Sequence, residues 1–548
     1  MSNPALLSPD DLRVWLQDGQ ELALLDVSEA RHYARSHIVA ARHLPLSQLA
    51  LQAPALLPRL GVRIVLCSAD VDVDAAQEQV QRAADLLREL GCTQLWSLQG
   101  GLQAWMAQGE LLIDGYNTLV KAFGERVRQH FEVPALSAQA LAQRWQQGVP
   151  TTVVDVRTLG EHRYSTLPRA LSYPGTEWPL CDLDAHAAAA QPGHLWAVTC
   201  FSRTRGVIGT ATQRVLRGAD VPVAWVDDGV MAWVVQGHAE VSDVEQAQEI
   251  LPVFAQSQAR AKAQELVARF ALASVDDEGL AQWRDDRERS VQLFDLRPGA
   301  ISRPGIQAVA GGQLLMHFEN LVVVRHARVV LLDEPHQLRS AVTAFWLAQL
   351  GECDVFLYAG DAGTIEAAGL QGGLPQYDDV QSVTADALAS RLAQLQAKVV
   401  DVGPSLDYVK THIVQAVHAN AAALASLQLA HAEARDQGQW LVLTSPDGQQ
   451  ARHAARALTR SLSAEASKNV RWLEGGTQAW IAQNQPVEAG HRPEQLLTAF
   501  LDDWGSIMRV PQEKRLPAWS SYLRWERNLA ARLDGDPGVR FRFFDAAA

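Results

Sequence analysis

Residues 195–216 read LWAVTCFSRTRGVIGTATQRVL, and they place Cys200 between an apolar run and a helical pattern. The run over 195–199 predicts a short buried strand, and the residues from Gly206 onward predict a helix. Cys200 is therefore expected in a strand-to-helix turn, with Arg203 and Arg205 close behind it. Free backbone N–H groups at a helix N-terminus stabilise negative charge, so we expect this turn to lower the pKa of the Cys200 thiol and to favour the nucleophilic thiolate.

The stretch belongs to a pattern that recurs four times along the chain. Each copy has a short amphipathic segment and then an apolar run that ends in an aspartate; the four aspartates are Asp26, Asp155, Asp295 and Asp401. Residues Ser8, Ser137 and Thr384 are the expected N-caps of three of the amphipathic helices. A second strand, a helix and a third strand with a glycine turn follow, as in VDDGVMAW at 226–233. The aspartates either close the turn after the strand or act directly in catalysis, and the sequence leaves both roles open.

Apolar strands that alternate with helices predict parallel sheets with helices on both faces, so the expected fold class is α/β. The repeat divides the chain into four units, a helical connector and a helical tail: 1–125, 130–245, 274–380 and 381–490 for the units, 246–273 for the connector, and 491–548 for the tail. We expect the tail helix to dock on the last unit. In such sheets the functional edge lies at the carboxyl ends of the strands, where Cys200 is expected.

The composition is that of a globular protein, with 48% apolar and 20% charged residues among 548. A formal net charge of −14 argues against nucleic acid or an anionic membrane as the main partner. We see neither an apolar stretch long enough to span a membrane nor a signal-peptide pattern. The five scattered cysteines, which lack metal-ligand spacing, fit a reducing compartment: Cys67, Cys92, Cys181, Cys200 and Cys353. We expect a cytoplasmic protein without a metal or cofactor.

The second unit resembles rhodanese-type sulfurtransferase domains. The resemblance rests on DVRTLGEHRYSTLPRALSYPG at 155–175, TCFSRTRGVIG at 199–209 and VDDGVMAW at 226–233. The chain as a whole resembles four such domains in tandem. This implies a persulfide relay, in which Cys200 takes a sulfane sulfur from a donor and passes it to a thiophilic acceptor. The implied partners are a small anionic donor, thiosulfate or a persulfide, and a thiol or cyanide as acceptor.

The resemblance also implies roles for the residues around Cys200. The turn after it would supply backbone N–H groups and bind the substrate, through Phe201, Ser202, Arg203, Thr204, Arg205 and Gly206. Arg205 would hold an oxyanion donor or steady the turn, and Arg203 would face the pocket mouth and attract anions. Asp155 and Arg157 would brace the loop from the neighbouring strand.

The other three units depart from this pattern. The first has Cys67 near the corresponding place, followed by the acidic stretch 70–74 and no arginine. Acidic neighbours raise the pKa of a thiol, so we expect Cys67 to be inactive or weak. The third unit has Asp333 there and the fourth has Thr444 or Ser445. None of these carries sulfane sulfur, and a single working site is expected.

Two other functions compete with sulfur transfer. Cysteine phosphatases hold phosphate in a Cys-x5-Arg cradle, whereas only four residues separate Cys200 from Arg205. The shorter loop makes a smaller pocket, suited to a single sulfur atom. A chain whose other units lack the nucleophile could also work as a non-catalytic scaffold or a sulfur-sensing binder. The complete turn at Cys200 argues against that role for the second unit.

Overall fold

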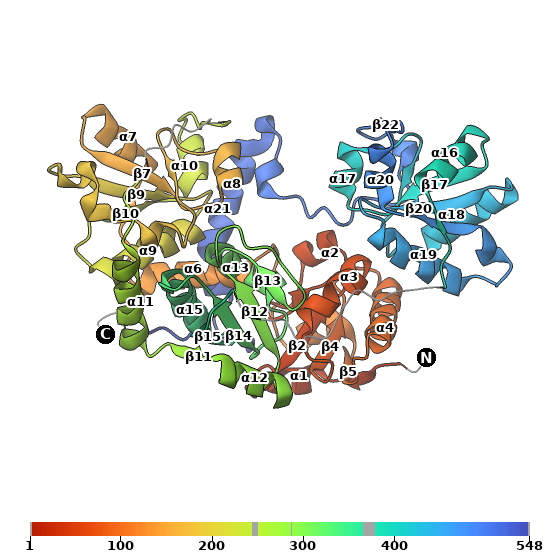
Figure 1. Cartoon of the computed structure of the whole chain (residues 1–548), viewed down its shortest axis with the longest axis horizontal. Helices are drawn as coiled ribbons and strands as arrows, with labels where there is room; N and C mark the ends of the chain where they lie inside the picture. Colours follow the sequence, from red (N-terminus) through yellow and green to blue (C-terminus); the bar gives the residue numbers. More distant parts are fainter. Residues whose placement is uncertain (1–2, 244–249, 287, 364, 366–378, 546–548) are drawn as a thin grey trace.

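The computed structural model describes residues 3–243, 250–286, 288–363, 365 and 379–545, and it contains four five-stranded sheets that share one strand order (Figure 1). Within each sheet the order along the sheet is first, fifth, fourth, second, third strand. All pairs within these four sheets are parallel, so the predicted α/β class is confirmed. The predicted junction at 245/246 lies outside the described residues.

The first sheet belongs to the first unit and comprises β1 (Ala5–Leu7), β2 (Leu22–Asp26), β3 (Arg42–His43), β4 (Arg63–Cys67) and β5 (Leu95–Leu98). Its helices are α1 (Pro9–Trp15), α2 (Ala30–Arg35), α3 (Leu46–Leu56), α4 (Val73–Glu89) and α5 (Gly101–Ala107). The second unit has β6 (Ala135–Leu136), β7 (Thr151–Asp155), β8 (Leu171–Ser172), β9 (Leu195–Thr199) and β10 (Val223–Val226). Its helices are α7 (Ala138–Gln146), α8 (Leu159–Tyr164), α9 (Thr204–Arg217) and α10 (Gly229–Val235), with 3-10 turns at η1 (Trp178–Leu180), η2 (Leu183–Ala185) and η3 (Ala187–Ala190).

The third unit has β11 (Ala273–Val275), β12 (Val291–Asp295), β13 (Ile306–Ala308), β14 (Arg328–Leu332) and β15 (Asp354–Tyr358). Its helices are α12 (Asp277–Asp286), α13 (Gly311–Met316), α14 (Phe318–Leu321) and α15 (Leu338–Leu350). The fourth sheet has β16 (Ser382–Val383), β17 (Ala397–Asp401), β19 (Val417–His418), β20 (Trp440–Thr444) and β21 (Val470–Leu473), and β18 (His412–Ile413) pairs separately with β22 (Val487–Glu488). Its helices are α16 (Ala385–Ala393), α17 (Ser405–Lys410), α18 (Leu424–Asp436), α19 (Gln449–Ser461) and α20 (Gly476–Ala482), with the 3-10 turn η4 (Ala466–Asn469).

Local side-chain hydrogen bonds explain where these elements begin and end. The side chains of Ser8, Ser137 and Thr384 each accept a hydrogen bond from a backbone N–H of the first helical turn, which confirms the three predicted N-caps. The repeated aspartates close the turn after their strands, since each accepts a hydrogen bond from the backbone N–H two residues later. The turn-closing role left open by the sequence is therefore present in all four units.

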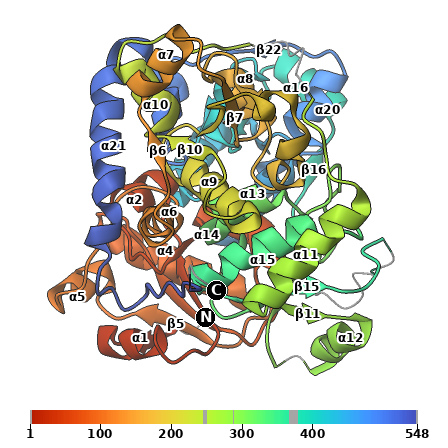
Figure 2. The same ribbon diagram turned by 90° about the vertical axis from the view of Figure 1, so that its left-hand side faces the viewer.

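Two helices outside the sheets join the units to one another. α6 (Thr118–His130) packs against α9 of the second unit, and the predicted end of the first unit at residue 125 falls inside it. α11 (Gln256–Phe270) lies in the predicted connector and packs along α15 of the third unit (Figure 2). In the part of the chain that the structure describes, no helix has the length and apolar character needed to cross a bilayer.

The C-terminal helix corrects one expectation. After η5 (Pro493–Gln495), η6 (Ile507–Arg509) and η7 (Gln512–Lys514), α21 (Arg515–Arg532) lies against α6 and α10 rather than on the fourth unit (Figure 1). Its buried face includes Trp519 and Leu523, which join the apolar core of the second unit. The Trp519 ring meets the Phe201 ring edge-on, with the centroids 5.4 Å apart. The helical pattern of the tail marks an apolar face but carries no information about which unit that face covers.

Trp519→Ala should destabilise the protein by about 3–5 kcal/mol, because it removes a fully buried indole from a packed core. The matched control on the same helix is Leu516→Ala, whose side chain is 52% exposed and whose loss should cost little. Urea unfolding followed by intrinsic fluorescence of the remaining tryptophans measures both. Equal losses for the two variants would contradict the docking of α21 on the second unit.

Candidate active site

Strand register fixes which residue of each unit corresponds to Cys200. The turn-closing aspartates pair across the sheet with Cys67, Thr199, Leu332 and Thr444 in units one to four. The residues that follow these partners are Ser68, Cys200, Asp333 and Ser445. The expectation that Cys67 corresponds to Cys200 is therefore wrong by one residue, and Ser445 rather than Thr444 stands in the fourth unit.

The one-residue difference sends Cys67 to a different environment, because successive side chains of a strand point to opposite faces. Cys67 is fully buried in β4, and its Sγ lies 3.6 Å from the Leu25 carbonyl oxygen of the neighbouring strand. Burial and the nearby Asp26 raise the pKa of its thiol well above the usual value. The cause is thus the interior of the sheet and Asp26 rather than the acidic stretch 70–74.

Cys200 lies directly after β9 and before α9, as predicted. The backbone N–H of Gly206, the third residue of α9, donates a hydrogen bond to its Sγ. On the other side, Gly229 at the start of α10 approaches the Cys200 carbonyl so closely that a Cβ there would lie 2.2 Å from the oxygen. Gly229 also has φ of +55°, so both its conformation and its contact require glycine. The glycine of the recurring Gly-x-x-x-Trp element therefore seats α10 against the Cys200 loop.

In two other units, the third residue of the following helix also donates its backbone N–H to the residue at the Cys200 position. The N–H of Ser340 donates to Asp333 Oδ2 at 2.9 Å, and the N–H of Ala451 donates to Ser445 Oγ at 3.2 Å. Ser340 and Ala451 are the third residues of α15 and α19. Three units thus share one geometry, and only the second places a sulfur atom in it.

The pKa of Cys200 is raised, whereas the sequence predicts that it is lowered. Burial raises the pKa of its thiol to about 11, with the carboxylate of Glu526 acting in the same direction. Arg205, the Gly206 N–H and Arg157 lower it, but together they do not offset the loss of solvation. The Cys200 side chain is only 3% exposed. In this conformation the protein holds Cys200 as a thiol at neutral pH.

Arg203 does not face a pocket mouth. It is buried, its guanidinium donates to Glu125 of α6 at 2.7 Å, and it also pairs with Asp228 at the start of α10. Its guanidinium carbon lies 5.0 Å from the centre of the Trp225 ring. Arg203 therefore ties the Cys200 loop to its surroundings, and its charge is met by the carboxylates of Glu125, Asp227 and Asp228.

Arg205 is held by Glu161 of α8, with Nη1–Oε2 and Nη2–Oε1 distances of 2.8 and 2.5 Å. This pair holds the pKa of the Glu161 carboxyl at about 2. Arg205 lies close enough to Cys200 to favour its thiolate. It thus keeps the position beside the thiol that the sequence predicts, although Glu161 already neutralises its charge.

Asp155 and Arg157 form a fully buried ion pair on the neighbouring strand. Arg157 donates to Asp155 through Nε and Nη2 at 2.9 and 2.7 Å, and it also donates to the Ser165 carbonyl. Arg157, Thr166 and His162 hold the pKa of the Asp155 carboxyl well below its usual range. The Arg157 guanidinium carbon lies 5.7 Å from the centre of the Phe201 ring, which places it against the Cys200 loop.

Acidic and aromatic residues that the sequence did not single out surround this loop: Glu125, Glu161, Asp228, Tyr522 and Glu526. Glu161 carried a local signal, since it forms a capping box with Thr158 at the start of α8. Asp228 stands in the recurring element directly before Gly229, whereas Glu125, Tyr522 and Glu526 come from outside the unit's repeated pattern, so no local pattern places them here. Across the described residues, no group of three or more His, Cys, Asp or Glu side chains is arranged to bind a metal ion.

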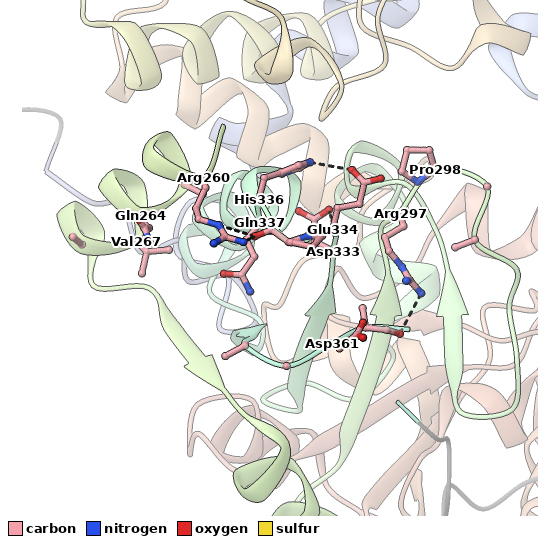
Figure 3. Close-up of a pocket in the computed structure, with 18 residues that line it drawn as sticks. Arg260, Gln264, Val267, Arg297, Pro298, Asp333, Glu334, His336, Gln337 and Asp361 are labelled. Atoms are coloured by element: carbon pink, nitrogen blue, oxygen red, sulfur yellow. Dashed lines mark hydrogen bonds and ion pairs between the residues drawn. The ribbon is translucent and has the colours of Figure 1, made fainter. Parts of the chain in front are cut away.

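The corresponding edge of the third unit is open where that of the second is covered. A cavity of about 980 Å³ lies there, between α11 and the loops that follow β12, β14 and β15 (Figure 3). Asp333 lines it, with its carboxylate held by the N–H groups of Glu334 and Ser340. The amide groups that meet a thiol in the second unit therefore meet an anionic side chain in the third.

Comparisons to known proteins agree with this fold. The family model of the rhodanese-like domain matches residues 8–108 and 384–483. The uncharacterized protein YqhL of Bacillus subtilis (strain 168) is 31% identical over 99 residues, which are 18% of this chain and 70% of that protein. The chain belongs to the rhodanese-like domain family. Its matched rhodanese-like domains are the first and fourth units, which lack a cysteine at the Cys200 position.

Two other relatives carry named activities. A crystal structure of a thiosulfate sulfurtransferase from Pseudomonas aeruginosa superposes with a TM-score of 0.86 at 29% identity, over 98% of this chain and 100% of that one. The adenylyltransferase and sulfurtransferase MOCS3-1 of Zea mays is 38% identical over 94 residues, 16% of this chain and 19% of that protein. The chain thus spans about a fifth of the length of the maize relative. Both of these proteins are named as sulfurtransferases.

Glu161→Gln should lower the stability at pH 7 by about 1–2 kcal/mol, because it removes the carboxylate partner of the half-buried Arg205. The folded-state pKa of Glu161 is depressed, so its contribution is present above the ordinary value of 4.5 and is lost as the pH falls toward 2. Urea unfolding at pH 7 and at acidic pH should show the gap between wild type and variant shrinking. A gap that stays constant with pH would contradict the ion pair.

Proposed function

We propose that this rhodanese-like protein is a sulfurtransferase that carries sulfane sulfur on Cys200 of the second unit. The observation that carries the proposal is the position of Cys200 after a sheet strand, with its Sγ accepting a hydrogen bond from the third amide of the following helix. Similarity over nearly the whole chain to a thiosulfate sulfurtransferase supports it. We propose further that the second and third units are also rhodanese-like, because their sheets have the strand order of the two matched units.

The reaction that these residues suit is a two-step exchange without net oxidation. The Cys200 thiolate attacks the outer sulfur of thiosulfate, a new S–S bond forms to Sγ, and the S–S bond of thiosulfate breaks as sulfite leaves with the electron pair. The acceptor, a thiolate or cyanide, then attacks the terminal sulfur of the Cys200 persulfide. The S–S bond to Sγ breaks, and the thiolate returns with that electron pair.

The residues around Cys200 have opposite effects on this chemistry. The Gly206 N–H, Arg205 and Arg157 stabilise negative charge on sulfur, and they would stabilise the persulfide anion in the same way. Burial and Glu526 stabilise the protonated thiol. Because the thiolate is the reactive form, sulfur uptake requires a state in which the site is more solvated than in this conformation.

The other three units are proposed to be inactive in sulfur transfer. Their residues at the Cys200 position are Ser68, Asp333 and Ser445, and none of these forms a persulfide. A cysteine phosphatase is less well supported, since the Cys200 loop keeps the shorter Cys-x4-Arg spacing. The inactive units also pack against the second unit. For example, Arg339 of the third unit donates a hydrogen bond to Glu177 of the second at 2.6 Å.

Cys200→Ser should abolish thiosulfate:cyanide sulfur transfer, because serine has no sulfur to form the persulfide. Cys67→Ser is the matched control: it makes the same exchange at the end of the corresponding strand of the first unit, and its activity should stay within about twofold of wild type. Thiocyanate production measures both. If wild type is inactive with thiosulfate and with persulfide donors, the scaffold function is favoured; full activity in Cys200→Ser would exclude Cys200 as the carrier.

A further inference from the structure

The C-terminal helix α21 covers the loop that follows Cys200. Trp519 packs against Phe201, and the Thr204 hydroxyl donates to Glu526 Oε1 at 3.2 Å. Tyr522 faces Ser202 from the same helix. These contacts join loop residues around 200 to a segment more than three hundred positions later in the chain. Phe201 and Thr204, which α21 contacts, are buried, and so is Cys200 itself.

Glu526 is the acidic residue of α21, and it lies on the face turned toward the site. Its side chain is 2% exposed, although a carboxylate is costly to bury without partners. Its neighbours are the Ser202 and Thr204 hydroxyls and the charges of Lys121 and Arg203. Every one of these contacts holds the Cys200 loop or the α6 helix beside it. Glu526 therefore anchors the helix on the candidate site.

The charges around the thiol come from three different elements. The charged groups that act on the Cys200 thiol are Arg157 after β7, Arg205 on α9 and Glu526 on α21. Arg157 is paired with Asp155 and Arg205 with Glu161, so both positive charges are already balanced. Displacing α21 would take the Glu526 carboxyl, whose own pKa is raised by burial, away from the thiol and leave these pairs in place. It would also let water reach the sulfur.

A second pair of contacts fastens the helix from its exposed side. Arg527 donates to Asp228 at the start of α10, and Asp228 also accepts a hydrogen bond from Arg203 of the Cys200 loop. Nearer the start of α21, Arg515 donates to Glu240 at 2.9 Å. Arg527 is about half exposed, whereas its partner Asp228 is buried. The helix is thus held by the buried Glu526, by Trp519 and Leu523 in the apolar core, and by ion pairs along its partly exposed side.

We propose that α21 is a movable cover of the Cys200 site and that Glu526 is its positioning residue, holding the loop closed until the helix is displaced. The catalytic meaning of this inference rests on the proposed function. The closed state itself is independent of the proposed function, because it is measured by chemical labelling of Cys200 without any sulfur donor.

Glu526→Gln keeps the shape of the side chain and removes its charge. The experiment is alkylation of the full-length protein by iodoacetamide between pH 6 and pH 11, with the Cys200 peptide quantified by mass spectrometry. We expect the apparent pKa of Cys200 to fall and its labelling rate at pH 8 to rise roughly three- to tenfold, since a larger thiolate fraction is partly offset by weaker nucleophilicity. Glu513→Gln, an exposed change just before α21, should leave the profile unchanged.

Arg527→Ala tests the cover without touching the buried anchor. Losing the pair with Asp228 should raise the labelling rate of Cys200 about two- to fivefold, because the helix opens more often. Arg524→Ala, an exposed arginine one turn away on the same helix, is the matched control and should label like wild type. Thermal unfolding of each variant shows whether the protein is folded. If Glu526→Gln does not fold, the labelling rate of Arg527→Ala alone tests the cover.

An unchanged labelling profile in folded Glu526→Gln and in Arg527→Ala would overturn the inference, as would equal acceleration by Arg524→Ala. Failure of sulfur transfer in wild type, with labelling accelerated as expected, would leave the cover standing and remove the proposed function. The reverse result, active transfer with unchanged labelling, would keep the function and remove the cover.

Discussion

One hydrogen bond organises the functional edge of three of the four units: the backbone N–H of the third residue of a helix donates to the side chain that follows the strand before it. It is present for Cys200, Asp333 and Ser445. The bond requires a short loop between strand and helix, and the turn-closing aspartate and the helix-starting glycine on either side keep that loop in place. The chemistry of a unit then depends on which side chain occupies the accepting position. A thiol can carry sulfur, whereas a hydroxyl or a carboxylate fills the same place without doing so.

The second unit differs from the third in what covers this position. α6 lies on one side of it and α21 on another, and they bring Glu125 and Glu526 to the loop. Burial is the main reason that the thiol pKa is raised rather than lowered, and the carboxylate of Glu526 adds to it, while Arg157 and Arg205 are paired with Asp155 and Glu161 of their own unit. The third unit has the opposite arrangement, since its edge opens into a large cavity but presents Asp333. The third unit thus has an open edge without a cysteine, whereas the second unit has the cysteine in a covered position.

Much of the architecture could be predicted because it depends on local pattern. The apolar runs, the amphipathic helices and their N-caps follow from periodicity and from single hydroxyl side chains such as Ser8 and Ser137. The register of Cys67 could not be predicted, because RIVLC and WAVTC end alike and only pairing with Asp26 shows that Cys67 lies inside its strand. The place of α21 depends on contacts over more than three hundred residues, and the acidic partners of Arg203 lie between 24 and 78 positions away in the chain. These contacts invert the expected electrostatics of the site, so a correct position for Cys200 came with a wrong protonation state.

The most direct test of the account is the mass of the tryptic peptide that contains Cys200, after incubation of the intact protein with thiosulfate and again after cyanide is added. The account predicts a gain of one sulfur atom on this peptide and its removal by cyanide, with the peptides of Cys67, Cys92, Cys181 and Cys353 unchanged. Thiocyanate formation without any sulfur on the Cys200 peptide, or with the sulfur on another cysteine, would contradict it.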